Sequence, residues 1–201
     1  MPKLVAGLFT AVLLLSPFGA AAGQEDARLD RLFADLKAAP SAREAQPIEH
    51  TIWRLWTHAG IEKVDAEMAA GALAMAVGEY KAAFRSFDAV VKMAPDFAEG
   101  WNKRATVEYL QGDFAASVGD IERTLALEPR HFGALSGLGL IYLAIGKERA
   151  AIRAFEGALA IHPLLPGARA RVKRLRRKLE ARKSEAPCAG RYPSETFGRR
   201  P

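Results

Sequence analysis

The side chains that could carry out chemistry are few in this sequence, and they are far apart. The chain of 201 residues contains four histidines and one cysteine, which are His50, His58, His131, His162 and Cys188. His50 and His58 are eight residues apart, so one helix face could present both, but no third zinc ligand lies near them. Cys188 has no histidine nearby, no serine lies in a nucleophile elbow, and no glycine-rich phosphate loop is present. We therefore expect no catalytic site, no metal and no cofactor.

Two sets of helix-breaking residues recur at a spacing of 34 residues. They are Pro95, Pro129 and Pro163, and Gly78, Gly112 and Gly146. A glycine permits the left-handed turn that ends one helix, and a proline stops the next. Alignment on both sets gives three contiguous windows, 64–97, 98–131 and 132–165, and each window predicts a pair of helices.

Residue size also repeats within the windows. The first helix carries a small residue, and the second carries a small residue followed four places later by a large apolar one. The small residues of the first helix are Gly71, Ala105 and Gly139, and the later residues are Ala83 and Phe87, Ser117 and Ile121, and Ala151 and Phe155. This pattern resembles the tetratricopeptide repeat. The resemblance implies an all-α, right-handed solenoid of three helix pairs that binds a protein or peptide partner and has no enzymatic activity.

The second window departs from this pattern. Arg104 and Glu108 occupy places that face the helix packing seam and are apolar or aromatic in the third window. They stand four apart, which predicts a local ion pair. We also expect Arg104 to reach an acid on the partner helix, Asp120 or Glu122, because an unpaired buried guanidinium is costly.

The segment 23–63 is predicted to be a helical hairpin that resembles a degenerate repeat and covers the front of the stack. Apolar residues at helical spacing indicate a first helix at about 26–38. A capping box of Ser41 and Glu44 opens a second helix.

Pro47 either kinks this second helix or starts it. Trp53 and Trp56 lie beside its apolar stripe. We expect the two tryptophans to pack in the core, with an exposed patch for a partner as the alternative.

The segment 166–183 predicts a basic helix that caps the other end of the stack. Val172, Leu175 and Leu179 form its narrow apolar stripe, and most other positions are Lys or Arg. The charge indicates either a soluble cap or contact with anionic lipid through residues 169–178. Nucleic acid is not an expected partner, because no aromatic residues are interleaved with these charges.

The net charge of +6 belongs to the C-terminal part of the chain. Residues 167–201 carry a net +9, whereas residues 23–166 carry a net −4. The last segment, 184–201, is polar and is expected to be disordered.

The N-terminus has the pattern of an export signal. Lys3 precedes an apolar run over 4–15, and small residues follow at 20–22. We expect residues 1–22 to be a signal peptide that is cleaved near Ala22, which would place the protein in the periplasm; a retained N-terminal anchor is the alternative.

The resemblance assigns the first helix of each pair to the concave side of the solenoid. The candidate groove residues there are Asp65, Met68, Met75, Glu99, Asn102, Thr106, Tyr109, Ser136 and Leu140. This lining favours an extended or helical peptide with an apolar stripe, with Tyr109 as its anchor and Asn102 as its backbone hydrogen-bond partner. Burial of Met68, Met75 and Leu140 by neighbouring helices is the alternative. His131 and His162, at the repeat boundaries, are expected to be ordinary surface residues.

The sequence therefore favours a periplasmic interaction scaffold or adaptor. A narrower version is an assembly factor for an exported protein such as a c-type cytochrome. The alternative is a peripheral envelope protein that its basic C-terminal helix holds to anionic membrane.

Overall fold

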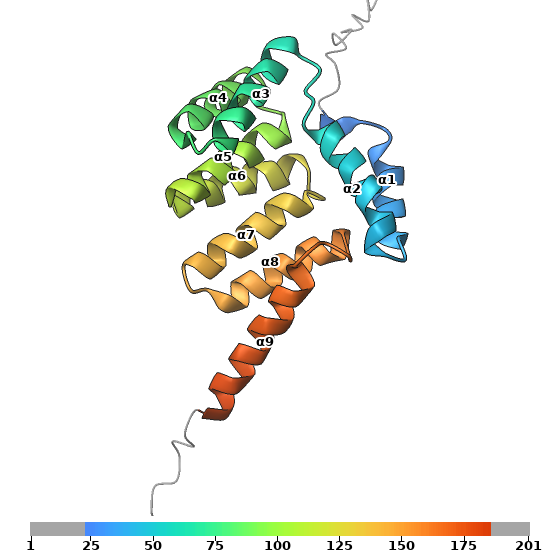
Figure 1. Ribbon diagram of the computed structural model, residues 1–201, viewed down its shortest axis with the longest axis vertical. Helices are drawn as coiled ribbons and strands as arrows, with labels where there is room; N and C mark the ends of the chain where they lie inside the picture. Colours follow the sequence, from blue (N-terminus) through green and yellow to red (C-terminus); the bar gives the residue numbers. More distant parts are fainter. Residues whose placement is uncertain (1–22, 186–201) are drawn as a thin grey trace, which may run out of the picture.

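The computed structural model describes residues 23–185, and this part of the chain is helical without a strand. A short 3-10 helix precedes nine α-helices in the described residues (Figure 1). The helices are η1 (Gly23–Glu25), α1 (Leu29–Ala38), α2 (Ala42–Trp56), α3 (Glu62–Ala76), α4 (Tyr80–Met93), α5 (Ala98–Gln111), α6 (Phe114–Leu127), α7 (Phe132–Ala144), α8 (Glu148–Ile161) and α9 (Ala168–Glu185). The predicted all-α class is confirmed.

Three antiparallel helix pairs, α3–α4, α5–α6 and α7–α8, stack into the predicted solenoid (Figure 1). Their internal turns fall at the predicted glycines. Gly78, Gly112 and Gly146 have φ values of +80°, +83° and +73°, which only glycine adopts without strain. The spacing of glycines therefore sets where each pair reverses.

The small residues of the first helices let each pair close. A Cβ atom on Gly71 would lie 2.6 Å from the Phe87 ring, and one on Gly139 would lie 2.7 Å from the Phe155 ring. Both phenylalanines are fully buried. In the first and third units, the small residue of the first helix therefore lies directly against the large apolar residue of the second.

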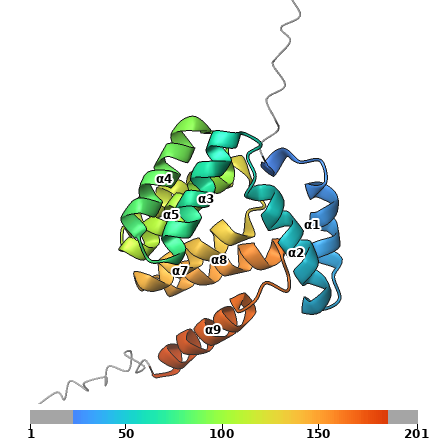
Figure 2. The same ribbon diagram turned by 45° about the horizontal axis from the view of Figure 1, so that its top comes forward.

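The N-terminal hairpin α1–α2 packs beside the third unit, and only the end of α2 adjoins the first unit (Figures 1 and 2). One hydrophobic cluster joins Leu36, Ile52 and Trp56 of the hairpin to Phe132 of α7 and Ala158 of α8. The expectation that the hairpin covers the first unit is therefore wrong. Its large aromatic side chains pack on the aromatic start of α7 instead of the small residues on the outer face of α3.

Polar contacts hold the hairpin in this place. Arg130 Nη1 donates to Asp30 at 2.6 Å, and the Arg130 guanidinium lies 4.5 Å from the Phe33 ring centre. The Gln24 side chain bonds the backbone at both Asp96 and Ala98, just before and at the start of α5. The hairpin is thus tied to the second and third units.

Ser41 is confirmed as the N-cap of the second helix, because Glu44 N donates to Ser41 Oγ at 3.3 Å. The Glu44 carboxylate accepts from Ser41 Oγ at 2.8 Å, so only the first of the two bonds of a capping box is confirmed. The helix begins at Ala42, so Pro47 lies inside α2 and does not start it. Trp56 is buried in the core as expected, whereas Trp53 remains half-buried.

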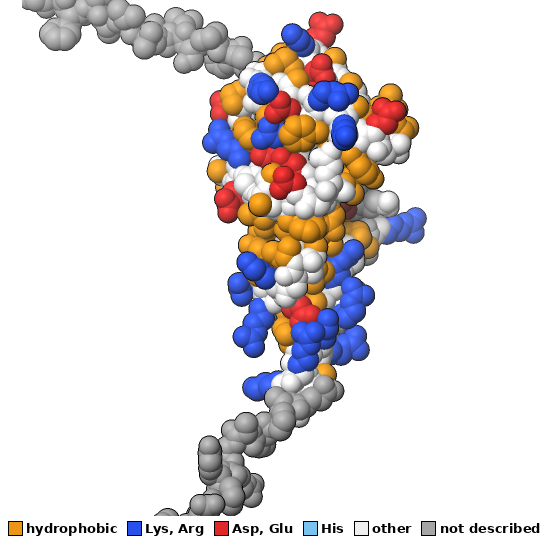
Figure 3. Space-filling model, turned by 90° about the vertical axis from the view of Figure 1, so that its left-hand side faces the viewer, with side chains coloured by type: hydrophobic (Ala, Val, Ile, Leu, Met, Phe, Trp, Pro, Cys, Tyr) orange, Lys and Arg blue, Asp and Glu red, His pale blue; other side chains and the backbone are white. Residues whose placement is uncertain are grey.

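Helix α9 packs on α8 through Val172 and Leu175, as its apolar stripe predicts. Its charges also pair with α8, since Lys178 and Arg182 both lie 2.7 Å from Glu148. Figure 3 shows Lys and Arg side chains gathered over this end of the molecule.

Helix α9 ends at Glu185, so it includes the first two residues of the predicted tail. The rest of that tail, and the predicted signal peptide at 1–22, lie outside the described residues. Within residues 23–185, no helix combines the length and the hydropathy that a bilayer crossing requires.

Two glycine-to-alanine substitutions are expected to have opposite effects on stability. Gly139→Ala places a methyl group against the buried Phe155 ring, and we expect a loss of about 1–2 kcal/mol. Gly119→Ala in α6 meets no atom within 4 Å, and we expect a gain of about 0.5–1 kcal/mol from its helix propensity. Urea unfolding followed by circular dichroism measures both. Equal effects would contradict the close helix approach.

Candidate functional site

A cavity of about 310 Å³ lies between α2 and the first helices of the second and third units. Five of the predicted groove residues line it, together with one tryptophan of the hairpin. These residues are Asn102, Thr106 and Tyr109 of α5, Ser136 and Leu140 of α7, and Trp53 of α2. The structure therefore brings together the predicted residues of two repeats and adds a wall that the sequence did not predict.

The cavity walls are mostly apolar, and some of the polar groups are already used. Thr106 Oγ1 donates to Asn102 O at 2.9 Å, and Asn102 Nδ2 donates to the Glu99 carboxylate at 2.9 Å. Tyr109 and Ser136 are half-buried at the cavity. Asn102 is buried and gives one amide hydrogen to Glu99, so its expected role as a hydrogen-bond partner of a peptide stays a prediction that depends on the rest of its amide group.

Glu99 is a correction to the predicted groove, because it is only 1% exposed and cannot touch a partner. Its carboxylate accepts hydrogen bonds from His131 and Asn102, and Lys103 Nζ lies 3.2 Å away. Burial opposes ionisation, but the bond from His131 and the charge of Lys103 keep the pKa of Glu99 below its usual value. A buried carboxylate is therefore part of the scaffold.

His131 is fully buried, which corrects the expectation of a surface residue. Its Nδ1 accepts a hydrogen bond from Ala134 N at 3.0 Å, so Nε2 carries the proton that is donated to Glu99 at 2.8 Å. The Trp56 ring stacks on the imidazole at 4.2 Å and 10°. His131 thus caps α7, links α7 to α5, and supports the hairpin.

His162 is also buried, and it joins α8 to the hairpin. Its Nε2 lies 3.2 Å from Glu49, which also accepts a hydrogen bond from Trp53 Nε1 at 3.3 Å. The bond to His162 lowers the pKa of Glu49. His131 directly precedes α7, and His162 directly follows the end of α8. Both histidines lie where successive helices meet, and this position in the sequence could have indicated that they are buried.

Arg104 pairs with the partner helix as predicted. Its Nε and Nη2 donate to Asp120 at 2.7 and 2.8 Å, and Nη1 donates to Asp88 of the preceding unit at 2.8 Å. The contact with Asp88 was not predicted. The expected local ion pair is wrong, because the three hydrogen bonds of Arg104 leave out Glu108.

Glu108 is left as a buried carboxyl whose Oε2 has no hydrogen-bond partner among the described residues. Burial, followed by the negative charge of Asp120, raises the pKa of Glu108 to about 7. Burial and the charge of Asp120 thus favour the protonated form of this carboxyl.

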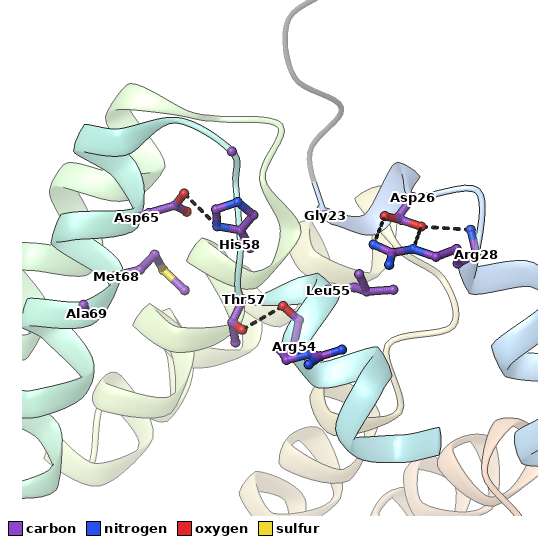
Figure 4. Close-up of a pocket in the computed structure, with 11 residues that line it drawn as sticks. Gly23, Asp26, Arg28, Arg54, Leu55, Thr57, His58, Asp65, Met68 and Ala69 are labelled. Atoms are coloured by element: carbon purple, nitrogen blue, oxygen red, sulfur yellow. Dashed lines mark hydrogen bonds and ion pairs between the residues drawn. The ribbon is translucent and has the colours of Figure 1, made fainter. Parts of the chain in front are cut away.

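The groove residues predicted in the first unit lie elsewhere. Asp65 and Met68 line a second cavity, of about 790 Å³, between α3 and the end of α2 (Figure 4). Asp65 accepts from Ala59 N at 2.7 Å and lies 2.8 Å from His58 Nδ1. Met68 is buried in the first unit's core, and Met75 is half-buried against it. The predicted groove across three units is therefore wrong, and two units form the cavity.

Within residues 23–185, no three His, Cys, Asp or Glu side chains are grouped so that they could hold a metal ion. His50 and His58 are exposed, and His58 pairs with Asp65.

The stacked 34-residue helix pairs and the lined concave side define a tetratricopeptide-type solenoid. The sequence profile of the tetratricopeptide repeat matches residues 68–123 and 111–166. A TPR repeat-containing protein of Rhizobium etli is 33% identical over 181 residues, which is 84% of this chain and 89% of that protein. The chain therefore belongs to the tetratricopeptide repeat proteins.

Solved structures share the fold at lower identity. The TPR domain of Sgt2 from Aspergillus fumigatus has a TM-score of 0.59 and 21% identity, and the match covers 69% of this chain and 93% of that domain. The first TPR of Spaghetti (RPAP3), bound to the HSP90 peptide SRMEEVD, has a TM-score of 0.57 and 20% identity, covering 59% and 94%.

Substitutions of His131 and of Glu99 are expected to lower the free energy of unfolding by different amounts. His131→Ala strands the Glu99 carboxylate, uncaps α7 and removes the ring beneath Trp56, so we expect a loss of at least about 3 kcal/mol. Glu99→Gln keeps an acceptor for His131 and should cost about 1–2 kcal/mol. Urea unfolding followed by tryptophan fluorescence measures both, with the exposed His50→Ala as control. The reverse order would show that the carboxylate is not held by His131.

The pKa of Glu108 predicts a pH dependence. An unfolded glutamate titrates near 4.5, so between this pH and about 7 the folded chain keeps a proton that the unfolded chain has lost. The free energy of unfolding contributed by this group therefore falls as pH rises through that range. Glu108→Gln removes the effect and should raise stability by about 1–2 kcal/mol at pH 8, with little change at pH 4.5. A constant difference between the two unfolding curves at all pH values would contradict the raised pKa.

Proposed function

We propose that this chain is a non-catalytic adaptor that holds an apolar segment of a partner protein in the 310 Å³ cavity. The observation that carries the proposal is the convergence of Trp53, Tyr109 and Leu140 on one concavity from three helices. Pockets of this size with apolar walls and few polar groups suit a large side chain. The first helices of successive units supply the rigid walls.

The charges around the cavity support an apolar ligand over an acidic one. Lys103 is a cation near the cavity, but it pairs with the buried Glu99 and lies 5.9 Å from the Trp53 ring centre. Glu49 lines the cavity and accepts from Trp53. An acidic peptide of the kind bound to the first TPR of Spaghetti would find no free cluster of cations here.

Export to the periplasm is part of this proposal. Its support is the positive start at Lys3, the apolar run over 4–15 and the small residues at 20–22. The packed body includes Gly23, where a Cβ atom would lie 2.1 Å from Leu55 O. N-terminal sequencing of the protein from a periplasmic extract should begin near Gly23, and an intact Met1 would contradict cleavage. An assembly factor for another exported protein remains one form of this adaptor.

A second candidate function is contact with anionic lipid through α9. Lys173, Arg174 and Arg177 are exposed and form no ion pair within the described residues, although Lys178 and Arg182 pair with α8. Sedimentation with vesicles of anionic and of neutral lipid tests this function. Binding to anionic vesicles that Lys173→Glu and Arg177→Glu abolish would support it, and no binding at low salt would exclude it.

A photo-crosslinking amino acid at Tyr109 tests the cavity directly. We expect crosslinks to a specific protein in the native cell when the probe replaces Tyr109, which lines the cavity. The matched control is the adjacent Leu110, which is 43% exposed and does not line it. Ser136→Phe should fill the cavity and reduce the Tyr109 crosslink at least about tenfold. Equal crosslinks at Tyr109 and Leu110, unaffected by Ser136→Phe, would contradict binding in the cavity.

A further inference from the structure

The first repeat unit exposes a helix face of which the other two units bury or half-bury all but the last position. On α3 this face consists of Ala66, Ala70, Leu73 and Val77, at positions i, i+4, i+7 and i+11. Leu73 is 68% exposed and Val77 is 65% exposed. At the last position, the place of Val77, Gln111 and Ile145 are exposed as well. Figure 1 places α3 and α4 at the end of the stack opposite α9.

The equivalent positions of the other two units indicate what packs on such a face. Val107 of α5 and Ile141 of α7 occupy the place of Leu73 in their own units, and they are 0% and 1% exposed. They are covered because α5 packs on α4 and α7 packs on α6. The face on α3 is therefore equivalent to surfaces that receive a helix, and no helix within residues 23–185 covers it.

The hairpin that precedes α3 in the sequence does not supply this helix. Ile52 and Trp56 of α2 are buried against Phe132 of the third unit, and moving them to α3 would open that core. Helix α9 packs on α8, so no helix of residues 23–185 is left to cover α3.

We propose that the helix that covers this face is α3 of a second copy, packed antiparallel about a twofold axis. The two small residues lie in the first half of the face and the two large residues in the second half. Because the spacing is symmetric, an antiparallel partner sets its Leu73 against Ala70 and its Val77 against Ala66. A parallel partner would set large against large and small against small, so the size pattern selects the antiparallel pair.

The charges at the two ends of α3 fit the same arrangement. Glu62 and Lys63 begin the helix, and Glu79 and Lys81 follow its end. All four are exposed, and none takes part in an ion pair among residues 23–185. An antiparallel copy brings the start of one helix to the end of the other, where opposite charges can meet at both ends.

The contact is isologous, so it closes at two copies. A head-to-tail array would need the other end of the stack, and α9 covers that end. The groove cavity stays outside the contact, because none of the four face residues lines it. Each copy can therefore present its own cavity.

Sedimentation equilibrium of the purified chain tests the association. We expect a monomer–dimer equilibrium at micromolar concentrations. Leu73→Asp enters the contact twice and should raise the dissociation constant at least about 100-fold. Leu110→Asp, on a residue that is exposed outside this face, is the matched control and should leave it unchanged. Circular dichroism verifies that both variants stay folded.

Disulfide formation tests the orientation in a Cys188→Ser background. A mixture of Ala66→Cys and Val77→Cys chains should crosslink to a heterodimer, whereas each variant alone should give at least about fivefold less dimer. A wild-type monomer at 200 μM would overturn the proposal and leave the face to a helix of a different protein. A dimer that Leu73→Asp does not weaken, or crosslinking of Ala66→Cys with itself, would also overturn it. None of these results bears on the Tyr109 crosslinking experiment, which tests the cavity and not the dimer.

Discussion

The buried hydrogen bond from His131 to Glu99 is the contact on which the rest of the arrangement depends. It spans the boundary between the second and third units, and the imidazole that donates it also carries the Trp56 ring. His131, Asn102 and Lys103 stabilise the buried carboxylate of Glu99. One polar contact in an apolar core thus fixes both the repeat junction and the place of the hairpin.

Two surfaces follow from the position of the hairpin. Trp53 becomes a wall of the cavity on the concave side, which α5 and α7 alone would leave open. At the same time the outer face of α3 stays uncovered, with Leu73 largely exposed. The position of the hairpin therefore gives the cavity a third wall and leaves a helix face exposed at the other end of the stack.

The sequence predicted the features of the fold that depend on the spacing of residues within one repeat. The glycine and proline intervals located the three helix pairs, small residues predicted the close approach of Gly139 to Phe155, and a charge at a seam position predicted the bond from Arg104 to Asp120. The sequence did not predict contacts between distant segments. Asp30 and Arg130 are 100 residues apart, and nothing in the apolar stripe of α2 tells the first unit from the third. The burial of Glu99 and His131 was missed for the same reason, since each residue is polar and their mutual hydrogen bond joins segments 32 residues apart.

The placement of the hairpin is tested most directly by distances between spin labels. In a Cys188→Ser chain, one label at Asp35 in α1 would be paired with a second label at Ala160 in α8 or at Lys81 in α4. The structure predicts a narrow distribution for each pair and a clearly shorter distance to Ala160. A shorter distance to Lys81 would mean that the hairpin stacks on the first unit, and it would contradict the cavity wall and the free α3 face together.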